Sequence, residues 1–177
     1  MRLFRFWALS AAIVWSACTA EAALAADTVE LGRAGPWDIR IDPTQGGSCF
    51  ALRGFPGTSV VMRLAYDRDG RKNHLLLSSA DWKSLESGKS YPLKIDFLGG
   101  SAHELTAMAQ PIGDTVMLLF AGLSREFLID FVSSSSMTIT YKNSRLGTFP
   151  LEGSSNALMA IAACQKEAGF AGDDPFK

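Results

Sequence analysis

Apolar and polar side chains alternate in short runs between residues 37 and 121. Alternation with a period of two is typical of strands that bury one face, and the Gly, Pro, Asp and Asn residues between the runs favour tight turns. A short helical turn is expected at residues 81–86, and a polar loop at residues 100–104. The pattern predicts strands at residues 37–41, 48–52, 59–66, 74–77, 91–97, 105–109 and 115–121.

The period of the hydrophobic pattern changes after residue 121. Leu123, Phe127 and Phe131 recur at helical spacing, and Ser124 can cap the N-terminus of the helix that they predict. Residues 127–131 also fit strand alternation, so a strand is the alternative for this segment. The remaining elements predicted are a hairpin at residues 137–141 and 145–149 and a terminal helix in the Ala-rich stretch 157–168.

This order of elements predicts an α+β fold. Consecutive antiparallel strands followed by a helix, a hairpin and a second helix are typical of a mostly antiparallel sheet or sandwich, with the two C-terminal helices packed on one face. No internal repeat or linker interrupts the chain after its N-terminal segment. Residues 27–177 are therefore expected to form a single domain.

The N-terminal segment has the layout of a secretory signal peptide. Met1–Arg5 carries two positive charges, Phe6–Val14 is apolar, and Ala23–Ala25 forms an A-x-A cleavage pattern. We expect cleavage near Ala25 or Ala26, removal of residues 1–26, and a periplasmic or secreted mature protein. A membrane anchor is the rival interpretation, but the apolar stretch of about 15 residues is shorter than the roughly 20 that a spanning helix needs. The mature chain is thus expected to lack a membrane span.

Cys18 supports a second interpretation of the same segment. Trp15-Ser16-Ala17-Cys18 approximates the lipoprotein signal, in which a small residue precedes a cysteine that becomes acylated. The leucine usual three places before that cysteine is replaced by Trp15. The alternative is therefore an envelope lipoprotein anchored at Cys18.

After cleavage, the chain keeps Cys49 and Cys164, an even pair in an oxidising compartment. Such a pair predicts one disulfide, which would close a loop of more than 100 residues. A redox-active pair would show C-x-x-C spacing, which is absent. Cys164 shares a helix face with apolar side chains, so the disulfide would hold the terminal helix on the strand that carries Cys49.

Charge and composition exclude several classes of protein. The mature chain has 15 basic and 17 acidic residues, a net charge of −2, without a basic cluster. This argues against a nucleic-acid partner and against a polybasic membrane-binding surface. Cys49 and Cys164 could be joined only by His74 and His103, and no ligand pair has zinc-site spacing. We predict no metal and no cofactor.

Candidate catalytic residues are weakly supported. Ser101, His103 and Glu104 are close in sequence, but neighbouring residues cannot form the facing relay of a triad. His74 begins a predicted strand, where an edge histidine is common. Asp67 and Asp69 resemble the start of a calcium loop, yet the later ligands are missing, so a hairpin turn is expected. We predict no catalytic residue.

The aromatic residues divide into core and surface candidates. Trp37 lies within an alternating strand and is expected in the core. Trp82 precedes the predicted helical turn and is expected to be half-exposed. Together with Tyr91, it could stack on a ligand. Trp82 and Tyr91 are therefore the candidate residues of a ligand cleft.

Two segments resemble a group of known proteins. Ser79–Tyr91, followed by a strand, and Leu151–Leu158 with Cys164 are similar to parts of small uncharacterised secreted proteins of Gram-negative bacteria. The matching segments make up less than a fifth of the chain. The resemblance implies a periplasmic, β-rich domain closed by a disulfide, and it implies no activity.

Taken together, these features favour a non-enzymatic periplasmic or secreted accessory or binding protein. Its partner would be another envelope protein or a small ligand, and the sequence assigns no oligomeric state. One alternative is a hydrolase of an envelope polymer, which requires two acids, or a Ser/His pair, to converge in a pocket. The other is the lipoprotein anchored at Cys18.

Overall fold

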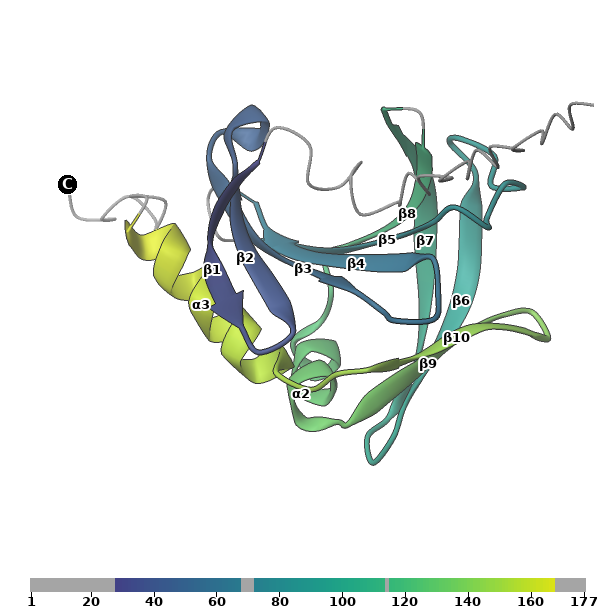
Figure 1. The fold of residues 1–177 in the computed structure, drawn as a ribbon. Helices are drawn as coiled ribbons and strands as arrows, with labels where there is room; N and C mark the ends of the chain where they lie inside the picture. The colour runs from purple at the N-terminus through teal and green to yellow at the C-terminus, as the bar shows by residue number, and fades with distance from the viewer. Residues whose placement is uncertain (1–27, 68–71, 114, 168–177) are drawn as a thin grey trace, which may run out of the picture.

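The computed structural model describes residues 28–67, 72–113 and 115–167, which form one antiparallel sheet of ten strands and two α-helices (Figure 1). The predicted signal peptide and Cys18 lie outside the described residues. The strands are β1 (Val29–Ala34), β2 (Trp37–Asp42), β3 (Ser48–Gly54), β4 (Val60–Tyr66), β5 (Asn73–Ser79), β6 (Ser90–Phe97), β7 (Ala102–Ile112), β8 (Thr115–Ala121), β9 (Ser136–Tyr141) and β10 (Ser144–Pro150). The helices are the 3₁₀ turn η1 (Pro43–Gln45), α2 (Arg125–Ser133) and α3 (Ser154–Glu167).

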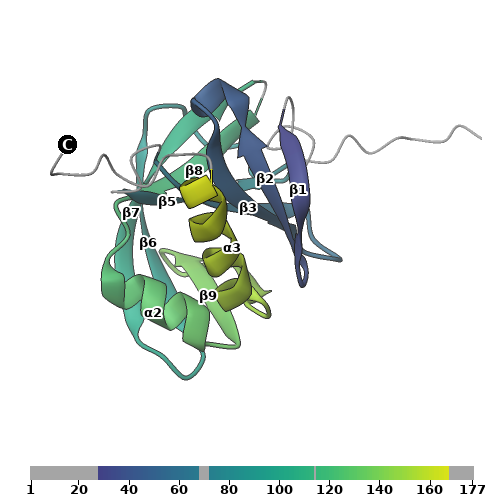
Figure 2. The same ribbon diagram turned by 90° about the vertical axis from the view of Figure 1, so that its left-hand side faces the viewer.

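The strand order within the sheet is β1-β2-β3-β4-β5-β8-β7-β6-β9-β10. Strands β1 to β5 form a meander, β6 to β8 form a second meander, and β5 pairs with β8 to join them. The β9–β10 hairpin attaches through β6. Figures 1 and 2 show that the sheet curls strongly, with α2 and α3 lying between the β1–β3 end and the β9–β10 end.

Alternation along each strand gives the sheet two faces, as the period-two pattern predicts. We call the face that contacts the helices the inner face. It carries the larger core cluster, including Leu64 of β4, Leu75 of β5 and Phe120 of β8, together with Phe127 and Phe131 of α2. Burial of this apolar surface is the main force that holds the helices to the sheet.

The opposite face, called the outer face, carries a second, smaller cluster. Phe50 and Leu52 of β3, Leu76 of β5 and Met117 of β8 are buried there. The central strands β3, β4, β5 and β8 are thus apolar on both faces, which explains why their sequences are nearly continuous hydrophobic runs.

Both predicted C-terminal helices are present, which confirms the α+β assignment. Ser124 caps α2, since its hydroxyl oxygen accepts a hydrogen bond of 3.1 Å from the backbone N–H of Phe127. Helix α3 begins at Ser154, slightly before the predicted residue 157, and it packs on β1, β2 and β3. The Glu152 carbonyl before α3 accepts hydrogen bonds from the Trp37 indole at 3.0 Å and from the Arg53 guanidinium at 2.8 Å. Trp37 is fully buried, as predicted.

The edges of the sheet are irregular. In β1, the register with β2 shifts beside Gly32, and in β10 the register with β9 shifts beside Gly147. Bulges at edge strands hinder pairing with a second chain. The structure therefore offers no regular edge for strand addition at either end of this sheet.

Three parts of the sequence prediction require correction. Strand β1 was not anticipated because it is an exposed edge strand without apolar alternation. Residues 102–104 belong to β7 and pair with β6, so the predicted polar loop is only the turn before them. Residues 81–86 form separate turns, with the backbone N–H of Leu85 bonded to the Trp82 carbonyl at 3.3 Å, and no helix.

Candidate functional site

A pocket of about 690 Å³ opens on the outer face of the sheet. Its wall combines the β2–β3 connection, the facing ends of β4 and β5, and the ends of β7 and β8. Small-molecule sites commonly have volumes of about 300–1,000 Å³. The dimensions of this pocket therefore suit a ligand of small-molecule size.

A buried ion pair forms one side of the pocket. Arg63 Nη2 lies 2.8 Å from Asp42 Oδ2, and both side chains are more than nine-tenths buried. The Arg63 guanidinium also stacks 3.8 Å above the centroid of the Phe50 ring. Asp42 accepts further hydrogen bonds from the Thr44 hydroxyl at 2.6 Å and from the backbone N–H groups of Thr44 and Gln45. Burial raises the pKa of Asp42, but the bonds from Thr44 and Arg63 outweigh it and hold the pKa below its ordinary value.

A second acidic group, Asp67, lies beside His74 in the same pocket. The distance from His74 Nδ1 to Asp67 Oδ1 is 3.4 Å. Burial lowers the pKa of His74, the charge of Arg63 lowers it further, and Asp67 only partly opposes them. His74 is therefore neutral near pH 7. The nearby carboxylate favours the tautomer with its proton on Nδ1, which leaves Nε2 as an acceptor.

The lowered pKa of His74 makes the stability of the protein depend on pH. The unfolded chain binds a proton near the ordinary histidine pKa of about 6.5, while the folded chain does so only at lower pH. We expect the free energy of unfolding to decrease as the pH falls from about 7.5 to about 5, and His74→Gln to reduce this decrease. Urea unfolding of wild type and His74→Gln at several pH values measures the free energy of unfolding and its decrease. An equal slope in wild type and His74→Gln would refute the assignment.

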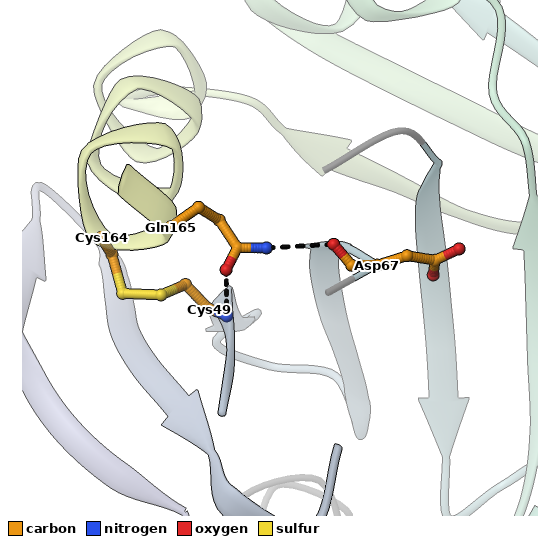
Figure 3. The surroundings of a disulfide bond; sticks show 4 residues. All are labelled: Cys49, Asp67, Cys164 and Gln165. Carbon is orange, nitrogen blue, oxygen red and sulfur yellow. Dashed lines mark hydrogen bonds between the residues drawn. A yellow bond between two sulfur atoms is a disulfide. The ribbon is translucent and has the colours of Figure 1, made fainter. Parts of the chain in front are cut away.

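The disulfide predicted between Cys49 and Cys164 is present and joins β3 to α3 (Figure 3). The next residue, Gln165, is buried and was not anticipated from the sequence. Its Oε1 accepts a hydrogen bond of 3.2 Å from the backbone N–H of Cys49, and its Nε2 donates one of 3.2 Å to the Asp67 carbonyl. Since Asp67 lines the pocket, the disulfide and Gln165 connect the end of α3 to the pocket wall.

The predicted cleft residues Trp82 and Tyr91 do not line this pocket. Trp82 is half-buried and packs against the main core. Tyr91 is 7% exposed. Its ring packs at 5.5 Å from that of Tyr141, and its hydroxyl oxygen accepts a hydrogen bond from the backbone N–H of Glu86. The Tyr91 ring is thus a packing residue that also holds the 79–89 loop, and only Trp82 keeps a partly open face.

The other histidine, His103, lies on the inner face. Its Nε2 is 2.7 Å from Asp130 Oδ2 of α2, and its ring packs edge-on against Phe97 and Phe127. Asp130 also accepts from the backbone N–H of Ser101 at 3.2 Å. The hydrogen bond from His103 is the largest cause that lowers the pKa of Asp130, and bonds from Ser101 lower it as well.

This second cluster has the wrong order for a nucleophilic relay. In a triad the histidine stands between the serine and the acid, whereas here Asp130 stands between His103 and Ser101. An aspartate of lowered pKa is a poor base for a serine hydroxyl. The two histidines occupy opposite faces of the sheet, and each meets a different carboxylate. The cluster at Asp130 therefore fastens α2 to the β6–β7 turn.

Within the described ranges, no three or more His, Cys, Asp or Glu side chains are grouped so that they could hold a metal ion. Neither α-helix of this part of the chain is long and apolar enough to cross a bilayer.

The fold has a counterpart among solved structures. It is similar to the crystal structure of a protein from Bartonella henselae described as invasion associated protein b, with a TM-score of 0.57 and 16% sequence identity. The similarity covers 78% of this chain and 98% of that chain. No protein-family model and no curated protein matches this chain. At this identity the likeness shows a fold shared with a bacterial protein.

Proposed function

We propose that this chain is a non-enzymatic exported protein of the bacterial envelope, which binds a small ligand in the outer-face pocket. The observation that carries the proposal is the pocket itself, with a buried Arg63–Asp42 pair in its wall. Buried charges are costly unless they are paired. A pair retained at a pocket rather than in the core supports a role in recognition.

Export is supported by the chemistry of the cysteines. Disulfides form and persist in oxidising compartments, and the Cys49–Cys164 bond fits an extracytoplasmic protein. The signal-peptide pattern at the N-terminus and the shared fold with the Bartonella protein agree with this location. That protein is described as invasion associated, and we propose for this chain the envelope setting rather than a specific role in invasion.

Binding without catalysis is supported by the arrangement of the polar groups. The two carboxylates of the described pocket residues already have partners in the protein. Asp42 accepts hydrogen bonds from Arg63 and Thr44, and Asp67 lies against neutral His74. Catalysis by two carboxylates, one as the acid and one as the base, requires both groups to face one reacting centre and to differ in pKa. The pocket therefore suits a ligand that is held by hydrogen bonds and released unchanged.

The proposal predicts a result in native mass spectrometry of the protein isolated from its own bacterial compartment. We expect a chain starting at Ala26 or Asp27, with one disulfide and a non-covalent adduct of small-molecule mass. Ala121→Trp, which places an indole in the pocket from an exposed position of β8, should lose the adduct. Ala102→Trp, at an exposed position of β7 outside the pocket, should keep it.

Several outcomes would contradict the proposal. A chain that keeps residues 1–26 would contradict cleavage, and an acylated chain starting at Cys18 would establish the lipoprotein alternative. An adduct retained equally by both tryptophan variants would place the ligand elsewhere. Absence of any adduct from the native protein would remove the support for a resident ligand.

A further inference from the structure

We propose that the ligand of the outer-face pocket is a neutral, hydroxyl-rich molecule of the saccharide class. This inference rests on the proposed function, because it assigns a chemical class to the ligand of the same pocket. Three features of the pocket carry it: its charge balance, its uncharged hydrogen-bonding groups, and its apolar floor.

Among the described residues that line the pocket, the charges cancel. Arg63 and Lys72 are cationic, Asp42 and Asp67 are anionic, and His74 is neutral near pH 7. The most buried charges, Arg63 and Asp42, are bonded to each other at 2.8 Å. A binding site for an anion or a cation has an excess of the opposite charge. This balanced wall instead suits a ligand without net charge.

The remaining polar groups supply donors and acceptors together. Ser48, Gln45 and Gln110, which carry hydroxyl and amide groups, also line the pocket. The Gln110 Nε2 lies 3.9 Å from Met108 Sδ, a weak acceptor, so this amide retains bonding capacity for a ligand. A sugar hydroxyl both donates and accepts, and this mixed set matches it.

One buried atom of the pocket wall adds to this match. Within the described part of the chain, Arg63 Nε is a buried donor without a hydrogen-bond partner. Buried polar atoms without partners are costly. Arg63 is 7% exposed, so this donor lies in the pocket wall rather than in open solvent. A small shift of the side chain on binding would let a ligand hydroxyl group accept a hydrogen bond from it.

The apolar lining fits the carbon skeleton of a sugar. Leu76, Leu119 and Ile112 form an apolar patch on the outer face, and all three line the pocket. Ring C–H groups of a sugar pack on such surfaces while the hydroxyl groups reach the polar wall.

The test uses nitrogen-15 NMR spectra of the mature chain with four probes, each at about 20 mM, a level that detects even millimolar affinity. The probes are maltose and N-acetylglucosamine as neutral sugars, alanyl-alanine as a zwitterion and inorganic phosphate as an anion. We expect the sugars to shift the amide signals of Asn73 and Gln110. Ala121→Trp should abolish these shifts, and Gln110→Ala should raise the Kd about three- to tenfold. Thr106→Ala, on the same strand and face but outside the pocket, should leave the Kd unchanged.

The outcomes separate the ligand class from the proposed function. Absence of sugar-induced shifts, or equal sugar-induced shifts in Ala121→Trp, would overturn the saccharide assignment. If alanyl-alanine or phosphate alone produces pocket shifts, the proposed binding function stands and the saccharide class falls. If no probe shifts the pocket signals and the native protein carries no adduct, both fall.

Discussion

Replacing Cys164 with Ser will lower the melting temperature of the oxidised protein by about 10–20 °C. The disulfide closes a loop with a sequence separation of 115 residues. In the chain-entropy model a loop of that size restricts the unfolded state by about 4 to 5 kcal/mol. Since the total stability of a domain is roughly 5 to 15 kcal/mol, the loss is a large share of it.

The environment of the disulfide adds to this effect. Cys49 is fully buried, and its backbone N–H is bonded to Gln165, the residue next to Cys164 (Figure 3). Without the covalent bond, α3 remains on β3 only through packing and this hydrogen bond. The end of the helix is therefore the part of the fold expected to separate first.

A matched variant isolates the covalent contribution. Ala163→Ser makes the neighbouring exposed position of α3 a serine and should leave the melting temperature nearly unchanged. Wild type that is reduced while unfolded, and then refolded in reductant, should melt close to Cys164→Ser. If the oxidised wild type and Cys164→Ser melt at the same temperature, the disulfide does not stabilise this fold.

Much of the fold could be predicted from the sequence because local patterns determine it. Strands β2 and β6 follow period-two alternation, the central strands are apolar runs bounded by turn residues, and Ser124 marks the start of α2. Strand β1 escaped prediction because an exposed edge strand buries too little to leave a pattern. Two further features could not be predicted, namely the curl of the sheet and the β5–β8 and β6–β9 pairings. Both depend on contacts between segments that are far apart in the chain.

The candidate site was harder to predict than the fold. Arg63 stands out as a charged residue in an apolar strand, but the sequence does not show that Asp42 lies opposite it. No pattern in the sequence indicated Gln165 or Asp130, because the hydrogen-bond partners of Gln165 are 98 and 116 residues away and those of Asp130 are 27 and 29 residues away. Trp82 and Tyr91 were selected because aromatic rings can stack on ligands, yet Tyr91 fills the core.

Asp42→Asn is expected to destabilise the protein by about 3–5 kcal/mol. The change removes the only carboxylate that pairs, within the described residues, with the buried guanidinium of Arg63. A buried charge without its partner costs far more than a surface pair contributes. Asp38→Asn is the matched control on the same strand, because Asp38 pairs with an Arg33 side chain that is 67% exposed. Its cost should stay at or below about 1 kcal/mol.

A double variant shows whether the stability lost in Asp42→Asn comes from the unpaired charge of Arg63 or from lost packing. In Asp42→Asn with Arg63→Met neither charge of this pair remains, and the methionine can pack on Phe50 in place of the guanidinium. Buried ion pairs replaced by apolar side chains of similar volume often lose little stability, so the double variant should unfold at a higher urea concentration than Asp42→Asn alone. If the two changes were simply additive, the cost of Asp42→Asn would come from its bonds to Thr44 and Gln45 instead. The pair would then be a by-product of the η1 turn, and Arg63 would be free to serve the ligand.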